Sequence, residues 1–429
     1  MVTELPIALS ERAEFASIDW LAHMQRFCES RSDLRATMRA PFSFSARYTN
    51  PPVHLDHTED ACGYCVTLAS DGVTVSAKPD ESADYFVEQD YNAALPIAWT
   101  VHGGNAHAFE RIRREYAHIA QSHPPRERGK IPDDPAVTQI LLALHDHMAR
   151  RTSNNPDIQQ RACALGLEGN LAELDELGYT ILRNAFTAEY ADELRQASHE
   201  NVIETPYANG EGIRRGMMNL HRGRMWEEAI VHPWVLTLAE HLLGRGCLVY
   251  QSSTIVKTTG QDAHPGLHSD YGASMVPPPY PDFCLEATAV WAIDDFREDC
   301  GPTVVLPGSF KKGRPVPPGT TQEGTTALVM DKGSIGFWHG ASWHGAMPRT
   351  AQGERTSLHN AYSRCFFRPL ERYEDIDATI LERNPPAFST LCGLDDALGK
   401  SSVEKTDFER LAYASQHAYG SSEPIAEST

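Results

Sequence analysis

Residues 333–346 read GSIGFWHGASWHGA, a short apolar and aromatic run bounded by glycines and followed by a second histidine-containing run. A run of this kind is typical of a buried β-strand. Comparable short runs stand at 248–257, 286–295, 302–309, 327–331 and 356–367. Many short strands at roughly regular spacing predict two packed sheets, in a β-sandwich or a jelly roll.

Two histidines and one carboxylate lie in this strand-rich region. His268 and Asp270 form a His-x-Asp pair after a Gly/Pro turn, and His344 lies several predicted strands further on. Two non-adjacent strands of a jelly roll can bring such side chains to one point. Two imidazoles and one carboxylate form the facial triad of non-haem Fe(II) oxygenases, which leaves coordination positions open. We therefore interpret His268, Asp270 and His344 as candidate iron ligands.

An arginine follows the second histidine. Arg355 lies in the polar stretch AQGER, just before the run 356–367. A surface arginine in a turn is the alternative interpretation. Beside a metal site, however, a planar guanidinium can hold a carboxylate through two parallel hydrogen bonds. An enzyme that uses 2-oxoglutarate needs this contact for the far carboxylate, so Arg355 is the candidate cosubstrate anchor.

The chain resembles the phytanoyl-CoA dioxygenase family of Fe(II)/2-oxoglutarate-dependent oxygenases over about 174–398. Several segments match that family in order and spacing: LDELGYTILRNAFTAEYADELR (174–195), HPWVLTLAEHLLG (232–244), HSDYG (268–272), VWAIDDFREDCGPTVVLPGSFKKGR (290–314) and WHGAMPRTAQGERTSLHNAYSR (343–364). The resemblance implies a double-stranded β-helix (jelly roll, cupin-like) catalytic domain with flanking helices. It also implies iron binding by His268, Asp270 and His344, cosubstrate binding by Arg355, and Fe(II), 2-oxoglutarate and O2 as cofactors.

Two positions depart from the family's pattern. Ser269 stands where the family often has Gln, and Phe310 stands where it usually has His. Neither position is an implied iron ligand, so the departures concern the substrate. Asp270 concerns the reaction type, because halogenases of the superfamily have Gly or Ala there to admit a halide. The carboxylate predicts hydroxylation or a related oxidation.

Other histidines compete for the ligand role. His339 and His359 lie close to His344 and Arg355, but only His344 places an arginine at the family's interval. We expect core or solvent-bonded histidines at both positions. The same His-x-acid spacing occurs at 54–56 and 57–59, where no partner histidine follows in a strand-rich region.

The substrate wall is predicted from large or charged side chains near the motifs, each of which could equally serve core packing or a structural ion pair: Met217, Met218, Trp226, Tyr271, Trp291 and Arg364. We expect a small-molecule or acyl-type substrate, hydroxylated with release of succinate and CO2. Two alternatives stay open. One is desaturation, ring closure or epimerisation by the same fold, and the other is a non-catalytic metal-binding jelly roll with a lipid-binding N-terminal domain.

The chain is predicted to be α+β overall, with a smaller N-terminal α+β domain at 1–165, the dioxygenase domain at 166–398 and a polar tail at 399–429.

Within the N-terminal domain, two β-rich runs in 62–77 flank Ser-Asp-Gly, which is a hairpin signal. Helical periodicity follows at 105–122 and 135–151, and the charged, Pro-rich stretch 122–133 is predicted to be a loop. The hairpin followed by helices in 67–119 resembles a sterol-carrier-like lipid-binding domain.

A possible zinc site is a separate question in this domain. His54, His57, Cys62 and Cys65 form an H-x2-H-x4-C-x2-C cluster of suitable ligands. Cys65 falls inside an alternating strand, however. The alternative interpretation is two solvent-exposed histidines and two buried thiols.

Charge and cysteine content limit the partners and the compartment. The 429-residue chain has a formal net charge of −20 at pH 7, which argues against a nucleic-acid partner. Because the sequence has no long apolar run and no basic leader, we expect no membrane span and no signal peptide. Nine cysteines, an odd number spread thinly, indicate free thiols and a cytoplasmic location. A homodimer is left open.

Overall fold

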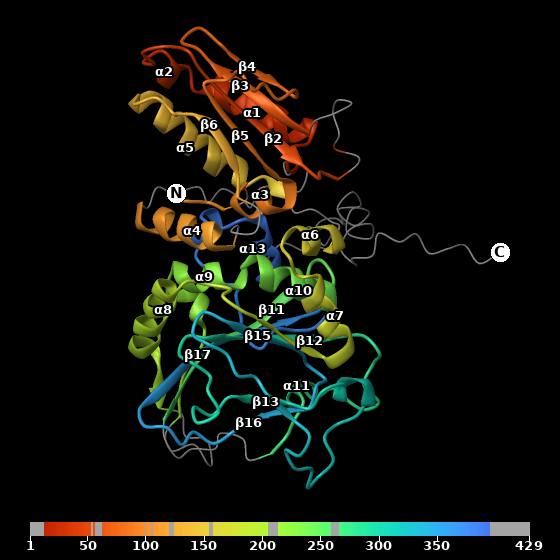
Figure 1. Cartoon of the computed structure of the whole chain (residues 1–429). Helices are drawn as coiled ribbons and strands as arrows, with labels where there is room; N and C mark the ends of the chain where they lie inside the picture. The colour runs from red at the N-terminus through yellow and green to blue at the C-terminus, as the bar shows by residue number, and fades with distance from the viewer. Residues whose placement is uncertain are drawn as a thin grey trace, which may run out of the picture. The chain divides into compact units, whose positions relative to one another are not determined.

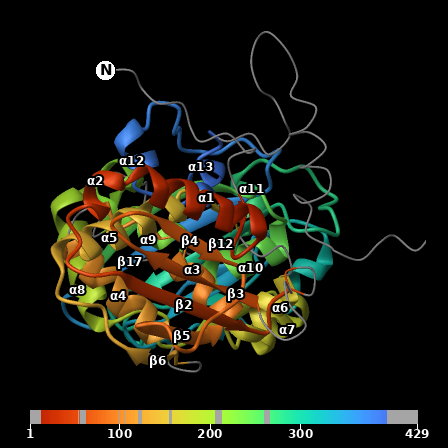
Figure 2. The same ribbon diagram turned by 90° about the horizontal axis from the view of Figure 1, so that it is seen from above.

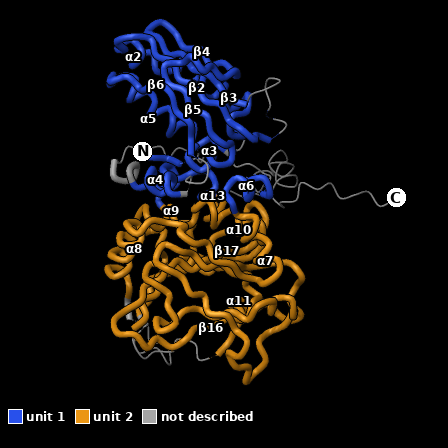
Figure 3. Tube along the Cα trace, viewed as in Figure 1, with its two compact units in different colours: residues 1–166, 377–389 blue, residues 167–376, 390–429 orange. Residues whose placement is uncertain are grey.

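A computed structural model of the chain describes residues 13–52, 55, 62–98, 100–103, 106–119, 124–153, 158–204, 213–258 and 266–394 (Figure 1). Two compact units make up the chain (Figure 3). The first holds Met1–Gly166 and Asp377–Ser389, and the second holds Leu167–Ile376 and Thr390–Thr429. Both contain helices and strands, which confirms the mixed α+β class. The histidines of the predicted zinc cluster, His54 and His57, and the tail at 399–429 lie outside the described residues.

The first unit is built around a five-stranded sheet in the order β4-β3-β2-β5-β6 (Figure 2). Its strands are β2 (Phe42–Thr49), β3 (Cys62–Leu68), β4 (Val73–Ser76), β5 (Tyr85–Asp90) and β6 (Arg126–Gly129), and a separate two-stranded pair joins β1 (Ala13–Glu14) to β7 (Thr152–Ser153). The hairpin predicted in 62–77 is confirmed, because β3 and β4 pair antiparallel.

The helices of the first unit are α1 (Ile18–Ser30), α2 (Ser32–Arg35), α3 (Tyr91–Ala98), α4 (Ala106–Ile119), α5 (Pro135–Ala149), α6 (Ile158–Ala164) and α12 (Ala378–Glu382), while α13 (Pro386–Leu391) crosses the division between the units. Trp20 and Met24 of α1, Ile140 of α5 and Val66 of β3 pack in one buried core cluster. Apolar residues three and four apart on each helix supply this face.

The loop predicted at 122–133 is wrong in part, because β6 forms within it and pairs with β5. All four residues of β6 are exposed, so the strand adds no apolar side chain to the core. Arg128 instead pairs with Glu81 at 2.6 Å and lies over the Phe86 ring at 5.1 Å. A charged, exposed edge strand of this kind gives no alternating hydrophobic signal in the sequence.

The segment 377–389 also differs from the prediction, which placed it in the dioxygenase domain. It belongs to the first unit, where Arg150 donates from Nε to the Glu382 carbonyl oxygen at 2.6 Å. Along the sequence, the chain therefore returns to the first unit after Leu167–Ile376 of the second.

The second unit contains two antiparallel sheets. The larger has the order β8-β15-β12-β17-β11-β10-β9 and the smaller has the order β14-β13-β16. The strands are β8 (Tyr179–Leu182), β9 (Ile203–Glu204), β10 (Ile213–Gly216), β11 (Leu248–Thr258), β12 (Glu286–Ala292), β13 (Thr303–Val305), β14 (Thr326–Ala327), β15 (Ile335–His339), β16 (His344–Ala346) and β17 (Glu354–Ser363).

The α-helices of the second unit are α7 (Glu168–Leu177), α8 (Ala188–Asn201), α9 (Arg224–Ile230), α10 (Pro233–Leu243) and α11 (Asp270–Ala273), with 3-10 helices at Asn219–His221 and Ser309–Lys312. The central strand β12 is buried at every position. One of its faces packs beneath helices, where Trp291 contacts Phe186 and His232. Its other face turns toward the smaller sheet, and the candidate site lies there.

Across the described residues, no helix is both long enough and apolar enough to cross a membrane.

Candidate metal centre

A reciprocal backbone pair brings the two candidate histidines together. The His268 N–H donates to the His344 carbonyl oxygen, and the His344 N–H donates to the His268 carbonyl oxygen, each at 2.8 Å. Their rings lie 4.2 Å apart between centroids. Antiparallel pairing places directly opposed side chains on the same face. The two imidazoles therefore point to one place although they come from distant parts of the chain.

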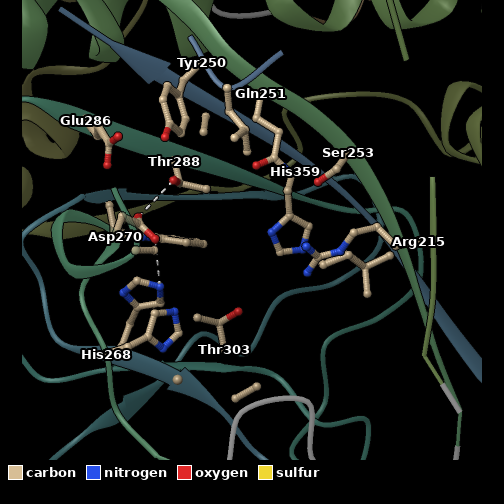
Figure 4. A pocket seen from close by; sticks show the side chains of 18 of the residues that line it. Arg215, Tyr250, Gln251, Ser253, His268, Asp270, Glu286, Thr288, Thr303 and His359 are labelled. Atoms are coloured by element: carbon tan, nitrogen blue, oxygen red, sulfur yellow. Dashed lines mark hydrogen bonds and ion pairs between the residues drawn. The ribbon is translucent and has the colours of Figure 1, made fainter. Parts of the chain in front are cut away.

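Asp270 joins them from the first residue of α11. Its backbone N–H donates to the Gly340 carbonyl oxygen at 2.9 Å. Its Oδ2 accepts hydrogen bonds from Thr288 Oγ1 at 3.2 Å and from Trp338 Nε1 at 3.1 Å. Its Oδ1 lies 3.5 Å from His344 Nε2. Two donors thus hold one oxygen of the carboxylate and leave the other directed at the histidines (Figure 4).

The backbone also determines the tautomer of His344. Its Nδ1 lies 3.0 Å from the Ser342 carbonyl oxygen, which can only accept a hydrogen bond. In a neutral ring, Nδ1 therefore carries the proton, and Nε2, which lies nearest Asp270, has the lone pair. A histidine that binds a metal is commonly oriented by such a bond from its other nitrogen.

The donor set fits a divalent first-row metal. One ligand atom from each of His268, Asp270 and His344 can be chosen so that all lie within 4.8 Å of one another. Two neutral nitrogens and one carboxylate oxygen on one face are the set that Fe(II) oxygenases use. Within the described part of the chain, this is the group of His, Cys, Asp and Glu residues that meets the geometric requirement for a metal.

The triad lines a cavity of about 300 Å³ inside the second unit. The larger sheet supplies one wall through β11, β12, β15 and β17, and β13 and β16 of the smaller sheet supply the other. Its polar lining residues outside the triad include Arg215, Tyr250, Gln251, Lys257, Glu286, Thr288, Arg355 and His359. Such a volume is at the lower end for small-molecule pockets, and many of the lining residues carry a polar group.

A bulge in β11 shapes this wall. The register of β11 against β17 shifts between Val249 and Gln251. Consecutive residues of a regular strand face opposite sides, but a bulge disrupts that alternation. Tyr250 and Gln251 consequently both line the cavity, and Ser253, Ile255 and Lys257 follow at alternate positions.

Arg355 lies on the cavity wall at one end of β17. It is 5% exposed, its Nη1 donates to the Gly301 carbonyl oxygen at 2.7 Å, and its guanidinium lies over the Phe296 ring at 4.1 Å. Burial, followed by the charge of Arg349, lowers the pKa of Arg355 to about 10. The side chain is therefore still a cation at neutral pH.

Lys257 is a second buried cation at the same end of the cavity, and it was not identified from the sequence. It faces Arg355 across the β11–β17 pair, and its Nζ donates to the Met347 carbonyl oxygen at 2.6 Å. Gly301 makes room for it: a Cβ there would lie 2.9 Å from Lys257 Nζ, and the glycine has φ of +70°. The two cations make this end of the cavity suitable for a carboxylate.

The two competing histidines are placed differently. Trp338 faces the cavity, so the next residue, His339, faces away from it; His339 packs on Phe310 at 4.8 Å and its Nδ1 accepts from the Ala341 N–H. It is a core histidine, as predicted. His359 is half-buried and lines the cavity, where its Nε2 lies 3.1 Å from Ser357 Oγ.

Burial, reinforced by Arg355 and Arg215, lowers the pKa of His359 to about 3. The ring is therefore neutral and offers polar atoms without charge.

The two residues that depart from the family pattern make contacts within the fold. Ser269 Oγ lies 3.2 Å from Tyr280 OH, and the Phe310 ring packs on His339.

The predicted substrate wall needs correction, because none of Met217, Trp226, Tyr271, Trp291 and Arg364 lines this cavity. Trp226, Tyr271 and Trp291 are core residues, each 1% exposed or less. Arg364 donates to the backbone carbonyls of Cys284 and Leu242. Met217 lies behind the wall, where its sulfur accepts from Gln251 Nε2 at 3.6 Å, and the N–H of Met218 donates to Glu371. The size of a side chain and its distance in sequence from the motifs did not show which face of the sheet it lies on.

Three further residues at the site were not found from the sequence: Thr288, Trp338 and Glu286. Glu286 had a usable signal, because it opens a mainly apolar strand, EATAVWA, that is buried at every position. Lys257 likewise follows the apolar pair Ile255 and Val256 near the end of β11. A charged residue in a strand that is buried on both faces rarely occurs without a polar partner.

The comparison with protein families agrees with this site. The model of the phytanoyl-CoA dioxygenase family matches residues 174–357, which include all three candidate ligands and Arg355. This segment belongs to the phytanoyl-CoA dioxygenase family of Fe(II)/2-oxoglutarate-dependent oxygenases, as the sequence resemblance implied.

Two similar curated proteins are uncharacterised proteins of Mycobacterium tuberculosis (Rv1501) and Mycobacterium bovis (Mb1539). Each is 24% identical over 156 residues, which are 35% of this chain and 56% of the relative. The chain therefore matches only about half the length of these relatives.

Similar solved structures include the non-haem alpha-ketoglutarate-dependent epimerase SnoN from nogalamycin biosynthesis, at 20% identity and a TM-score of 0.40 over 48% of this chain and 86% of that chain. HygX from Streptomyces hygroscopicus, with nickel and 2-oxoglutarate bound, has 13% identity and a TM-score of 0.41 over 50% of this chain and 93% of that chain. Likeness at this level is too low to assign a substrate or a reaction.

Proposed function

We propose that this protein is an Fe(II)- and 2-oxoglutarate-dependent dioxygenase that hydroxylates a small-molecule or acyl-type substrate. In this proposal the two sheets of the second unit form a double-stranded β-helix, and the second unit is the catalytic domain. The observation that carries the proposal is the convergence of His268, Asp270 and His344 on a cavity that also contains the buried Arg355.

The roles of the residues follow from the geometry. His344 Nε2, a ring nitrogen of His268 and Asp270 Oδ1 would hold the metal. Arg355 and Lys257 would hold the far carboxylate of 2-oxoglutarate at the cationic end of the cavity. Bound Fe(II) supplies the oxidising chemistry, in which O2 converts 2-oxoglutarate to succinate and CO2 and the substrate is oxidised. The buried walls keep water away from the reacting centre.

Asp270 favours hydroxylation over halogenation, because a carboxylate already supplies the anionic ligand.

A cytoplasmic location is part of the proposal and is supported by the cysteines, all nine of which are free thiols.

Metal and cosubstrate binding test the proposal directly. Fe(II) should bind at one equivalent under anaerobic conditions, and 2-oxoglutarate should then bind to the loaded protein, both measured by calorimetry. His268→Ala and His344→Ala should each lose iron while the circular dichroism spectrum stays that of a folded protein. His339→Ala is the matched control, because that histidine faces away from the cavity, and it should keep iron. Unchanged iron content in either ligand variant would disprove the assignment.

A further inference from the structure

A second polar group lies in the same cavity, away from the cationic end. Glu286, the first residue of β12, is 1% exposed and lines the cavity. Ser274 Oγ donates to Glu286 Oε1 at 2.5 Å, and Tyr250 OH lies 3.1 Å from Ser274 Oγ. Figure 4 shows Glu286 and Tyr250 together on one side of the cavity, with His359 on the other.

The remaining oxygen of Glu286 lacks a partner. Oε2 is fully buried and has no hydrogen bond to any described residue. A polar atom left in this condition costs stability. Burial raises the pKa of Glu286 to about 8, and the nearby Asp270 charge acts in the same direction against the Ser274 hydrogen bond. In the free protein at pH 7 the group is therefore mostly a protonated carboxyl, and a cation bound beside it would favour its ionised form.

Glu371 shows how the same unit treats a carboxyl that serves the fold. It is 5% exposed, and both of its oxygens are satisfied. Oε1 accepts from the Met218 N–H, and Oε2 accepts from the Ser252 N–H and from Tyr373 OH. A structural role would give Glu286 similar partners, so the unpartnered oxygen of this cavity-lining residue points to a ligand.

The backbone holds Glu286 in place. Its carbonyl oxygen accepts from the Gly340 N–H at 2.7 Å, and a Cβ at Gly340 would lie 3.0 Å from the Glu286 Cβ. Asp270 is bonded to the same glycine through its own N–H. Glu286 and the candidate metal ligand are therefore positioned from one backbone residue.

The two ends of the cavity have opposite polarity. Along β17, Arg355 opposes Lys257 of β11, whereas Ser363, at the other end of the strand, opposes Glu286 of β12. A dicarboxylate is attracted to the Arg355 end and repelled from the Glu286 end. A cation has the opposite preference, so the Glu286 end is left for a group of the substrate.

We propose that Glu286, with Ser274 and Tyr250, forms a substrate subsite for a protonated amine. An ammonium group offers three donors and a positive charge, whereas a hydroxyl offers one donor and no charge. Only the ammonium can both pair Oε2 and stabilise the ionised form of this buried carboxyl group. This inference rests on the proposed function, because it assigns a substrate class to the same cavity.

The test uses simple probes of equal length. Butylammonium chloride, butan-1-ol and sodium butyrate are each titrated at pH 7 into the full chain loaded anaerobically with Fe(II) and 2-oxoglutarate, and binding is followed by calorimetry. We expect butylammonium to bind at least about tenfold more tightly than butan-1-ol, with butyrate weakest, since a charge-assisted hydrogen bond is about twice as strong as a neutral one. Equal binding of the amine and the alcohol would overturn the proposal.

Variants of Glu286 show whether this residue causes the preference for the amine. Glu286→Gln keeps the shape but cannot ionise, so the preference for the amine should disappear. Glu286→Asp keeps an ionisable carboxyl on a shorter side chain and should retain part of the preference, which covers the case in which the glutamine variant folds poorly. Glu371→Gln is the matched control and should keep the full preference. Selectivity that survives Glu286→Gln in a folded protein would also overturn the proposal.

The 2-oxoglutarate titration separates the two levels of inference. If 2-oxoglutarate fails to bind the iron-loaded protein, the proposed function is wrong. If it binds and the amine shows no preference, only the assignment of Glu286 is wrong.

Discussion

Arg355 and Lys257 show what a buried cation requires at the level of single residues. Each donates to a backbone carbonyl, and a Cβ at Gly301 would lie 2.9 Å from Lys257 Nζ. Burying a charge costs free energy. A dicarboxylate bound at this end of the cavity would offset that cost.

Arg355→Ala should weaken 2-oxoglutarate binding by roughly 30-fold or more, because losing one partner of a buried charge pair costs about 2 kcal/mol or more. Arg355→Lys should recover only part, since a point charge cannot form two parallel hydrogen bonds. Lys257→Met should weaken binding as well. Calorimetry on the iron-loaded protein measures all three, with the exposed Arg372→Ala as control. Unchanged affinity in both Arg355 variants would rule out the anchor role.

The buried His339 should make the stability of the folded protein sensitive to acid. Burial, followed by the charge of Arg364, lowers its pKa to about 4, whereas an unfolded histidine titrates near 6.5. Between these values the unfolded chain binds more protons than the folded one, so stability is lost as the pH falls. The contribution between pH 7 and pH 5 is about 2 kcal/mol.

His339→Asn removes this titration and keeps an acceptor for the Ala341 N–H. We expect the variant to lose less unfolding free energy than the wild type between pH 7 and pH 5, measured by urea denaturation at each pH. A parallel pH dependence in the two proteins would show that His339 is not the group responsible.

At the scale of elements, the site depends on where β12, β15 and the turn before α11 meet. Gly340 links them, because its N–H donates to Glu286 and its carbonyl oxygen accepts from Asp270. A Cβ there would lie 2.6 Å from the Glu286 carbonyl oxygen and 3.0 Å from the Tyr271 ring. Close approach of three backbones at this point requires glycine.

Gly340→Ala should therefore lower stability by about 1–3 kcal/mol through overpacking and weaken iron binding by displacing Asp270. Gly169→Ala is the control, since a Cβ at Gly169 in α7 meets nothing within 4 Å, and it should leave both properties nearly unchanged. Thermal unfolding and iron titration report the two effects separately. Full iron affinity in a destabilised Gly340→Ala protein would show that the turn adjusts independently of the strand.

At the scale of the whole molecule, the chain forms two units with separate cores, and the candidate metal centre belongs wholly to the second. Cys62 and Cys65, the described half of the predicted zinc cluster, belong to β3 of the first unit. Cys62 is 1% exposed and part of the core cluster, which is the position of a buried structural thiol.

Replacing both Cys62 and Cys65 with Ser should lower the stability of the first unit by about 1–3 kcal/mol, because a hydroxyl is buried in place of a thiol. Iron binding should not change in the folded protein. Elemental analysis should find no zinc lost from the double variant. One equivalent of zinc in the wild type, absent from the variant, would instead establish a zinc site.

The residues of the candidate site could be read from the sequence alone: the His-x-Asp pair, the second histidine and the arginine after it all lie within the segment that matches one family. Such features are local, because a residue type and an interval can be read without knowing what lies opposite. The hairpin of the first unit was also local.

Only the tertiary structure decided which side chains face the cavity. Strand alternation allows two faces, and the choice depends on register against strands far along the chain. Trp338 faces the metal ligands and His339 does not, while Trp291 faces the helices. Lys257 and Glu286 became site residues only once pairing with β17 placed them at its opposite ends, because the cost of burying a charge arises from neighbours that the sequence does not place beside it.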